Sequence, residues 1–437
     1  MNRSSWQFFT LGGVAGALAG TALTASLFLV GPLSGPEDLE PGGLKIYSGA
    51  DPSGQRQQLI DMWNDLQPDN PAELVELQEI ADDQYATMTE GAGDADIFNL
   101  DVTWTARFAA PVTGQPLIRP IDESRLGRPA DESFMEKPLR TCWHKGQLWA
   151  LPFNTDAGLL YYRTDLNLGV EAEPPFDWPK LISATEKALA TPGSKFEAGY
   201  VGQLDLYEGL TVNFLEVVWA IGADIAIGTD GRVEIDIAKW NEAVRLISPA
   251  REGQPGIVLP ESAEFEEGPS RRAFQEGRVP FMRNWPVAHR ALSTGEATGA
   301  QTPPAGKRIS FDLANLPGPS VLGGQNLAIS ANTKKPRAAQ ELIEFLTGEG
   351  SQRRLFNDGG FAATQESIYE DEEIKQKYHY LPTLRNAIAG ARFRPESPNY
   401  VAFSQELGQH VRAVLLGRAA SLPEDLADQL TEALQGR

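Results

Sequence analysis

The chain has a single cysteine, Cys142, which excludes an intramolecular disulfide. Its four histidines are scattered, so no cysteine and histidine cluster has metal-site spacing. The sequence also lacks a Gly-x-Ser-x-Gly elbow, a phosphate-binding loop and a dinucleotide fingerprint. We therefore expect no metal, no cofactor and no enzyme of these classes.

Basic residues are scarce. There are 38 lysines and arginines against 59 aspartates and glutamates, which gives a net charge of −21. This balance argues against binding to a nucleic-acid backbone, which needs clustered positive charge. It also argues against an amphipathic hold on anionic lipid. The excess acid predicts a solvated, soluble surface, or selection for neutral or cationic ligands.

Charge is missing altogether between residues 8 and 33, a run long enough to cross a bilayer at about 20 residues per helix. Ala17 and Ala19 could mark signal cleavage, but the apolar stretch continues past them. Residues 1–33 are thus predicted to be a signal or a membrane anchor, and the Pro/Gly/acidic residues 34–43 a linker. No cysteine follows the leader, which excludes a lipid anchor. The bulk of the chain should be extracytoplasmic.

The length of 437 residues predicts two domains, because single hydrophobic cores stop growing below this size. Residues 44–47, 73–77 and 95–100 read as strands and 55–66 as a helix, with a polar helix before the third strand. This order predicts an α/β fold with a mostly parallel sheet. Ligands of such sheets lie beyond the carboxyl ends of the strands, where Asp51, Asp101 and Trp104 fall.

Two apolar runs, 148–153 and 159–162, flank the polar step Asn154-Thr155-Asp156. The pattern predicts two buried strands joined by a polar crossing from one lobe to another beside a cleft. Further along, an apolar strand over 279–282 leads to Trp285, and Pro286 then blocks further pairing. Trp285 is therefore expected at a loop end.

Three segments carry a resemblance to a known family. They are the crossing at 145–166, the Tyr-Glu-Gly-Leu and Asn-Phe-x-Glu pattern within 200–218, and the Phe-x-x-Gly and Trp pattern within 274–288. Together they resemble extracellular solute-binding protein family 1, the carbohydrate-binding proteins of ABC transporters of the trehalose/maltose type. Residues 101–110 are similar too, but Arg107 replaces the family's acidic residue.

The resemblance implies a two-lobed periplasmic-binding-protein-like fold of type II, with hinged α/β lobes around a central cleft. The implied first lobe is 44–153 plus 314–360, and the second is 154–313 plus 361–437. Residues 356–364 would form the third crossing, and Thr333 would cap the helix that Pro336 begins.

Sugars are held by aromatic faces and by planar polar groups that bond neighbouring hydroxyls. Together with the resemblance, this chemistry predicts nine ligand-binding residues: Asp51, Asp101, Trp104, Asn154, Asp156, Tyr207, Glu208, Trp285 and Arg392. Seven of them have a structural alternative. Trp104 and Trp285 could fill the core, Asp101, Asn154 and Asp156 could be caps, Glu208 could sit in the first turn of a helix, where negative charge is favourable, and Arg392 could lie on the surface.

We therefore expect a monomeric, non-enzymatic protein that captures a di- or oligosaccharide and delivers it to the transmembrane subunits of an ABC permease. One alternative is a membrane-tethered sensor with the same fold. Another is a glycoside hydrolase that uses two carboxylates. A third is an iron site at Tyr161 and Tyr162, although no histidine supports it.

Overall fold

The computed structural model describes residues 39–51, 53–77, 84, 86–91, 93–110, 114–166, 177–249, 257–294 and 309–437. The predicted leader, residues 1–33, lies outside the described residues. Of the polar helix expected before the third strand, the described part contains the π-helical turn η2 (Thr87–Gly91), and residues 78–83, 85 and 92 lie outside. Within the described ranges, no helix combines the length and the apolar character needed to cross a membrane.

The first lobe is built on a six-stranded sheet in the order β2-β1-β3-β14-β4, with β7 also paired to β14. β1 is parallel to both β2 and β3, as the sequence predicts, whereas β14 is antiparallel to β3. The helix α2 (Gln55–Leu66) matches its prediction. The strands are β1 (Leu44–Gly49), β2 (Ala72–Leu77), β3 (Ile97–Asp101), β4 (Ile118–Arg119), β7 (Ala150–Ala157) and β14 (Leu322–Ser330).

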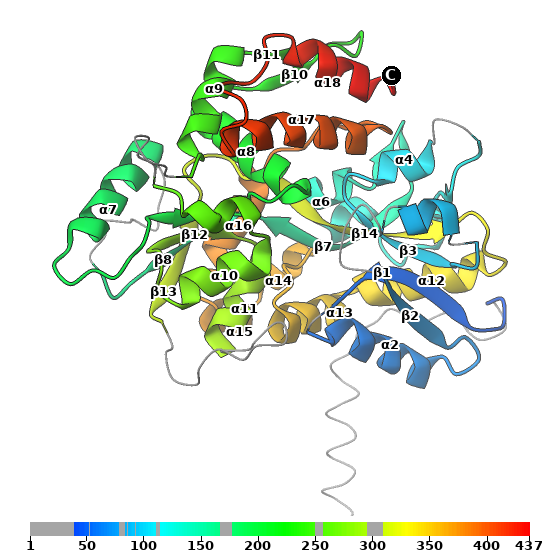
Figure 1. Cartoon of the computed structure of the whole chain (residues 1–437). Coiled ribbons are helices and arrows are strands. Elements are labelled where there is room, and N and C mark those ends of the chain that lie inside the picture. The colour runs from blue at the N-terminus through cyan, green and yellow to red at the C-terminus, as the bar shows by residue number, and fades with distance from the viewer. Residues whose placement is uncertain are drawn as a thin grey trace, which may run out of the picture.

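The second lobe has a four-stranded sheet in the order β13-β8-β12-β9. Its strands are β8 (Leu159–Arg163), β9 (Tyr200–Val201), β12 (Phe281–Asn284) and β13 (Phe311–Asn315). β12 lies two residues later than the predicted strand, so Trp285 follows it directly. Figure 1 shows this sheet on the left and the first-lobe sheet on the right, with α2 below the latter and α12 (Pro336–Thr347) at the level of β1.

The crossing between the lobes is more regular than the sequence indicates. The polar step at 154–156 does not interrupt β7, which continues to Ala157 and is separated from β8 by Gly158 alone. The reason is pairing: Asn154, Thr155 and Asp156 lie opposite Gln325, Gly324 and Gly323 of β14. The third predicted crossing also contacts this ribbon, because Ala362 bridges to Thr155.

The first residues of α12 determine where this helix begins. Pro336 begins α12, as predicted, since this position needs no amide hydrogen. Thr333 is not its cap, however: Lys335 holds that position, and the Thr333 hydroxyl accepts from the Lys335 amide at 3.0 Å. The buried face of α12, with Leu342 and Ile343, packs in the first-lobe core.

Two helices of the second lobe position side chains of the candidate site. α8 (Glu208–Ala220) starts directly after Tyr207, and α17 (Tyr400–Leu415) packs against it. Both contribute to one apolar core that includes Phe214 and Phe403. Figure 1 shows α8 and α17 together with α18 (Leu426–Leu434) at the top of the molecule.

Candidate functional site

A cavity of about 840 Å³ lies between the lobes. Both lobes and the crossing ribbon supply its walls. All predicted ligand-binding residues except Asp51 and Arg392 line it: Asp101, Trp104, Asn154, Asp156, Tyr207, Glu208 and Trp285. Arg107, which departs from the family pattern, is not part of the wall; its guanidinium lies 3.5 Å from the Asn399 side-chain oxygen.

Asp51 caps the start of α2 and does not line the cavity. One of its carboxylate oxygens accepts from the Ser53 amide and hydroxyl at 2.9 and 2.6 Å, and the other from the Arg56 amide at 2.8 Å. The Arg56 amide is one of the donors that the helix itself leaves open. The Asp51 carboxylate therefore serves the turn before α2 and not the cavity wall, where it was predicted.

Arg392 also lies outside the cavity. Its guanidinium donates to the Asp224 carboxylate at 2.6 and 2.8 Å and stacks 4.7 Å from the centre of the Trp219 ring. The arginine in the cavity wall is Arg394, two residues further on. The sequence presents both arginines in one polar segment and offers no signal that separates them.

Arg394 joins the two sides of the cavity. Its side chain is 3% exposed, and it donates to Glu208 at 2.6 Å and contacts Asp101 at 3.4 Å. Burial lowers the pKa of Arg394, but Asp101, Tyr400 and Glu208 raise it by more, so the pKa lies above its ordinary value. Arg394 therefore stays charged, and it holds carboxylates from β3 and α8 in one place.

Glu208 is fixed by three donors. Besides Arg394, the Tyr400 and Ser404 hydroxyls of α17 donate to its oxygens at 2.5 Å each. The first turn of α8 is thus tied to α17 through a carboxylate in the cavity wall. Glu208 both orients Arg394 and presents its remaining lone pairs to the cavity.

Asp156 is the carboxylate on the crossing ribbon. The Asn154 amide lies 3.4 Å from it, and no ion pair to Asp156 is found among the described residues. Burial raises its pKa to about 7, against the opposing effect of Arg56 and Arg283. A partly buried carboxyl without a fixed cation is well suited to bond neighbouring hydroxyls of a ligand.

The two tryptophans differ in their availability. Trp104 is 7% exposed and belongs to the first-lobe core, so the core alternative accounts for most of its surface. Trp285 is partly buried, and its indole N–H donates to Glu267 at 3.1 Å. The Arg283 guanidinium lies 3.8 Å from the centre of the Trp285 ring. Trp285 is the better stacking surface for a ligand.

Several cavity residues were missed from the sequence. Arg56, in the first turn of α2, donates to Ser48 and Gly49 at 3.1 and 3.2 Å and also to the Gln325 side chain. An arginine in an amphipathic helix ordinarily indicates a solvated face, so the pattern gave no signal. Burial lowers the pKa of Arg56. The other missed wall residues include Asn99, Glu266, Glu267, Gln325, Phe361, Arg394 and Tyr400.

Some polar atoms of the wall have no hydrogen-bond partner in the described part of the chain. They are Asn99 Oδ1, Asn154 Oδ1, Tyr207 Oη, Arg56 Nε and Arg394 Nε. A buried polar group without a partner costs about 1–3 kcal/mol, so such atoms favour a polar ligand or water beside them. Over the same described ranges, no group of three or more histidine, cysteine or acidic residues is arranged to hold a metal ion.

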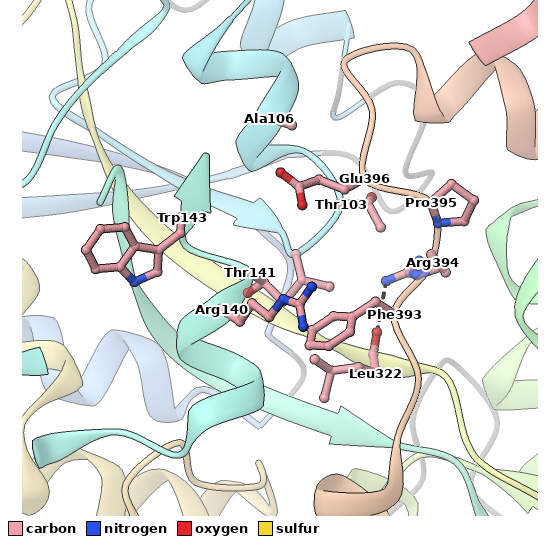
Figure 2. A pocket seen from close by; sticks show the side chains of 11 residues that line it. Thr103, Ala106, Arg140, Thr141, Trp143, Leu322, Phe393, Arg394, Pro395 and Glu396 are labelled. Carbon is pink, nitrogen blue, oxygen red and sulfur yellow. Dashed lines mark hydrogen bonds between the residues drawn. The ribbon is translucent and has the colours of Figure 1, made fainter. Parts of the chain in front are cut away.

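A second, smaller cavity of about 230 Å³ shares Arg394 and Thr103 with the first. Figure 2 shows Arg394 beside Phe393 and Leu322, with Arg140 and Trp143 on the first-lobe side. Its only acidic lining residue, Glu396, lies 3.3 Å from His144. Arg394 thus stands where the two cavities meet.

Comparisons with known proteins agree with this architecture. The family model for bacterial extracellular solute-binding proteins matches residues 51–353. The chain is 30% identical over 376 residues to a probable ABC transporter-binding protein of Deinococcus radiodurans, which covers 81% of this chain and 84% of that protein.

Solved structures are similar over nearly the whole chain. Maltose-bound MalE3 of T. maritima has a TM-score of 0.74 and 26% identity, covering 90% of this chain and 99% of that one. The GacH receptor of Streptomyces glaucescens, solved unliganded and with acarbose, has a TM-score of 0.71 and 19% identity over 91% of this chain and 98% of that chain. The second likeness concerns the fold alone. The predicted two-lobed fold is confirmed.

Proposed function

Because the chain belongs to the family of bacterial extracellular solute-binding proteins, we propose that it captures a di- or oligosaccharide between its lobes and delivers it to an ABC permease. The observation that carries this proposal is an indole, Trp285, in the wall of a cavity whose other residues are largely polar. An aromatic face and planar hydrogen-bonding groups are the two devices that recognise a sugar ring.

The size and chemistry of the cavity support a sugar. Its volume of about 840 Å³ falls within the range of about 300–1,000 Å³ that is usual for small-molecule sites. Asp156 and Asn154 on the crossing ribbon and Arg394 near the hinge supply acceptors and donors for hydroxyls. MalE3 of T. maritima, which is similar at 26% identity, was solved with maltose.

Three other carboxylates of the cavity wall are engaged with neighbouring side chains, which favours binding over catalysis. Asp101 and Glu208 both contact Arg394, and Glu267 accepts from the Trp285 indole. These acids are committed to orienting other side chains, so none of them is placed as a free nucleophile of a glycosidase pair. We propose a non-catalytic monomer, with the lobes bounded as predicted and residues 1–33 serving as its signal or tether outside the cytoplasm.

A thermal-shift panel tests the proposal. Maltose, maltotriose, trehalose and glucose are each added to the purified protein. A ligand that binds only the folded state stabilises it by about 2.7 kcal/mol at a hundredfold excess over its Kd, which raises the Tm. We expect at least one oligosaccharide to give a saturable increase.

The Trp285→Ala variant is the control, because sugars also stabilise proteins weakly as excluded solutes. It should fold and lose the saturable part of the shift. A flat response of the wild type to the whole panel would refute the proposed function, and an undiminished shift in the variant would remove Trp285 from the site.

A further inference from the structure

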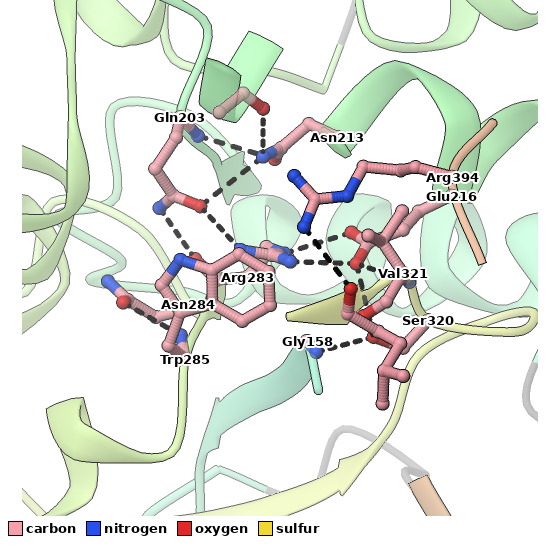
Figure 3. A network of polar contacts seen from close by, with 12 residues as sticks. Gly158, Gln203, Asn213, Glu216, Arg283, Asn284, Trp285, Ser320, Val321 and Arg394 are labelled. Carbon is pink, nitrogen blue, oxygen red and sulfur yellow. Dashed lines mark hydrogen bonds and ion pairs between the residues drawn. The ribbon is translucent and has the colours of Figure 1, made fainter. Parts of the chain in front are cut away.

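The Arg283 side chain is 1% exposed and lies at the centre of a buried polar network behind Trp285 (Figure 3). Its Nε and Nη2 donate to the two carboxylate oxygens of Glu216 at 2.9 and 2.7 Å. Its Nη1 donates to the Gln203 side-chain oxygen at 3.2 Å. Every nitrogen of the guanidinium is therefore engaged, and its plane is fixed.

Glu216 connects this network to the segments that cross between the lobes. Its Oε1 also accepts from the Val321 amide at 3.1 Å. The Ser320 hydroxyl oxygen lies 3.2 Å from Glu216 Oε1 and 2.8 Å from the Val321 carbonyl oxygen, so these two acceptors share its one proton. Ser320 Oγ in turn accepts from the Gly158 amide at 2.5 Å. Gly158 separates β7 from β8, and Val321 directly precedes β14, so the ion pair contacts two of the segments that pass between the lobes.

The contact at Gly158 leaves no room for a side chain. A Cβ atom there would lie 2.6 Å from Glu216 Oε1 and 2.7 Å from Arg283 Nη2. The crossing backbone therefore packs directly on the ion pair, which makes the pair part of the hinge.

Trp285 is held against the same pair. The Arg283 guanidinium lies 3.8 Å from its ring centre, and its N–H is bonded to Glu267. Gly323 of β14 approaches its far edge, where a Cβ would lie 3.3 Å from the ring. The indole is thus fixed by the second lobe beneath it and by a crossing strand at its edge.

We propose that Arg283 and Glu216 are positioning residues, which fix the Trp285 stacking surface to the two crossing segments and so couple sugar binding to the hinge. The inference rests on the proposed function. Neither side chain lines the cavity, so any effect of theirs on binding passes through residues that do. A purely structural ion pair would change the Tm and leave the affinity unchanged.

The first test is a double-mutant cycle on the full chain, with maltotriose as the probe and Kd measured by calorimetry. Arg283→Met is combined with Glu216→Gln, so that no lone charge stays buried. Trp285→Leu keeps an apolar group in the wall and should leave a weaker, measurable affinity. We expect the paired change to weaken binding about tenfold in the wild type and less than about twofold in the Trp285→Leu background.

A matched pair of serine variants separates positioning from stability. Ser320→Ala removes the hydroxyl that links Gly158 to Glu216. Ser351→Ala removes an equally buried hydroxyl in the first lobe, where it donates to the Phe345 carbonyl at 2.7 Å. Both should lower the Tm, but only Ser320→Ala should weaken maltotriose binding, by about threefold.

Amide hydrogen exchange without ligand provides a readout that does not depend on the proposed function. Ser320→Ala should increase exchange at residues 281–288, to which the Ser320 hydroxyl is linked through Glu216 and Arg283. Ser351→Ala should leave this segment unchanged. If the wild type binds no maltotriose, the proposed function fails for this sugar, and the exchange result alone decides the inference.

Two results would overturn it. One is an equal loss of affinity from the paired change in both backgrounds, which would show that Arg283 does not act through Trp285. The other is unchanged amide exchange at residues 281–288 in Ser320→Ala, which would show that the crossing segments are not coupled to the segment that carries Trp285.

Discussion

Arg394 is the residue that connects the carboxylates of the cavity wall. It bonds Glu208 of the second lobe and contacts Asp101 at the end of β3, and its side chain is almost fully buried. A charged hydrogen bond to a fixed carboxylate orients both groups. Loss of the guanidinium would leave Glu208 and Asp101 facing each other's negative charge without a counterion between them.

We predict that Arg394→Met reduces oligosaccharide affinity by at least about a hundredfold and lowers the free energy of unfolding by about 3 kcal/mol, because it breaks a buried ion pair. Arg392→Met is the matched control. Its arginine pairs with Asp224 on the surface, so affinity should stay within about twofold and stability within about 1 kcal/mol. Calorimetry and urea unfolding measure both quantities, and equal losses in the two variants would contradict this assignment.

For single residues, the sequence predicted which types of side chain form the cavity wall better than it predicted their positions. Asp101, Asn154, Asp156, Tyr207, Glu208 and Trp285 could be selected because they stand where strands or helices begin or end. Arg56 and Gln325 could not, since one lies within an amphipathic helix and the other within a buried strand. Their role depends on pairing across more than two hundred residues of sequence, as between Arg56 and Gln325.

Among the elements, the ribbon of β7 and β14 positions most of the cavity floor. Gly324 has φ of +120°, and a Cβ there would lie 2.3 Å from the Asn154 carbonyl oxygen. The close approach lets the backbone of β14 pack on β7 where Asn154 and Asp156 face the ligand. The irregular register at Gln325 and Asn326 belongs to the same feature.

We predict that Gly324→Ala destabilises the protein by about 2 kcal/mol or more, since alanine meets both an unfavourable φ and a clash with backbone. Gly390→Ala is the control, because nothing lies within 4 Å of a Cβ at that position. Its effect should stay within about 1 kcal/mol of zero. Thermal unfolding of the two variants gives the comparison, and an unperturbed Gly324→Ala would show that the ribbon tolerates a wider separation.

The element pattern could be predicted where local chemistry decides it. The helix α2 has the predicted bounds, 55–66, because its apolar face and the prolines after it are visible in the sequence. The polar step in β7 could not be predicted as strand, because its regularity comes from pairing with β14. For the same reason the start of β12 was misplaced: its partners β8 and β9 set its register.

For the molecule as a whole, the charge of −21 and the two-lobed fold bear on different properties. The charge keeps the surface solvated, whereas recognition depends on a few buried groups that both lobes bring to one cavity. Length and strand order predicted two α/β lobes, and the resemblance predicted the cleft. The distances across it could not be predicted, because they depend on how the lobes pack around the crossing ribbon.

We propose that one polar ligand is held between the lobes, in contact with both. The most direct measurement is calorimetric titration of the oligosaccharide that raises the Tm into the wild type, Asp101→Asn and Trp285→Ala. We predict one site per chain, with affinity reduced about tenfold or more by the first-lobe and by the second-lobe substitution alike. Full affinity in either variant, or no saturable heat with the wild type, would contradict the account.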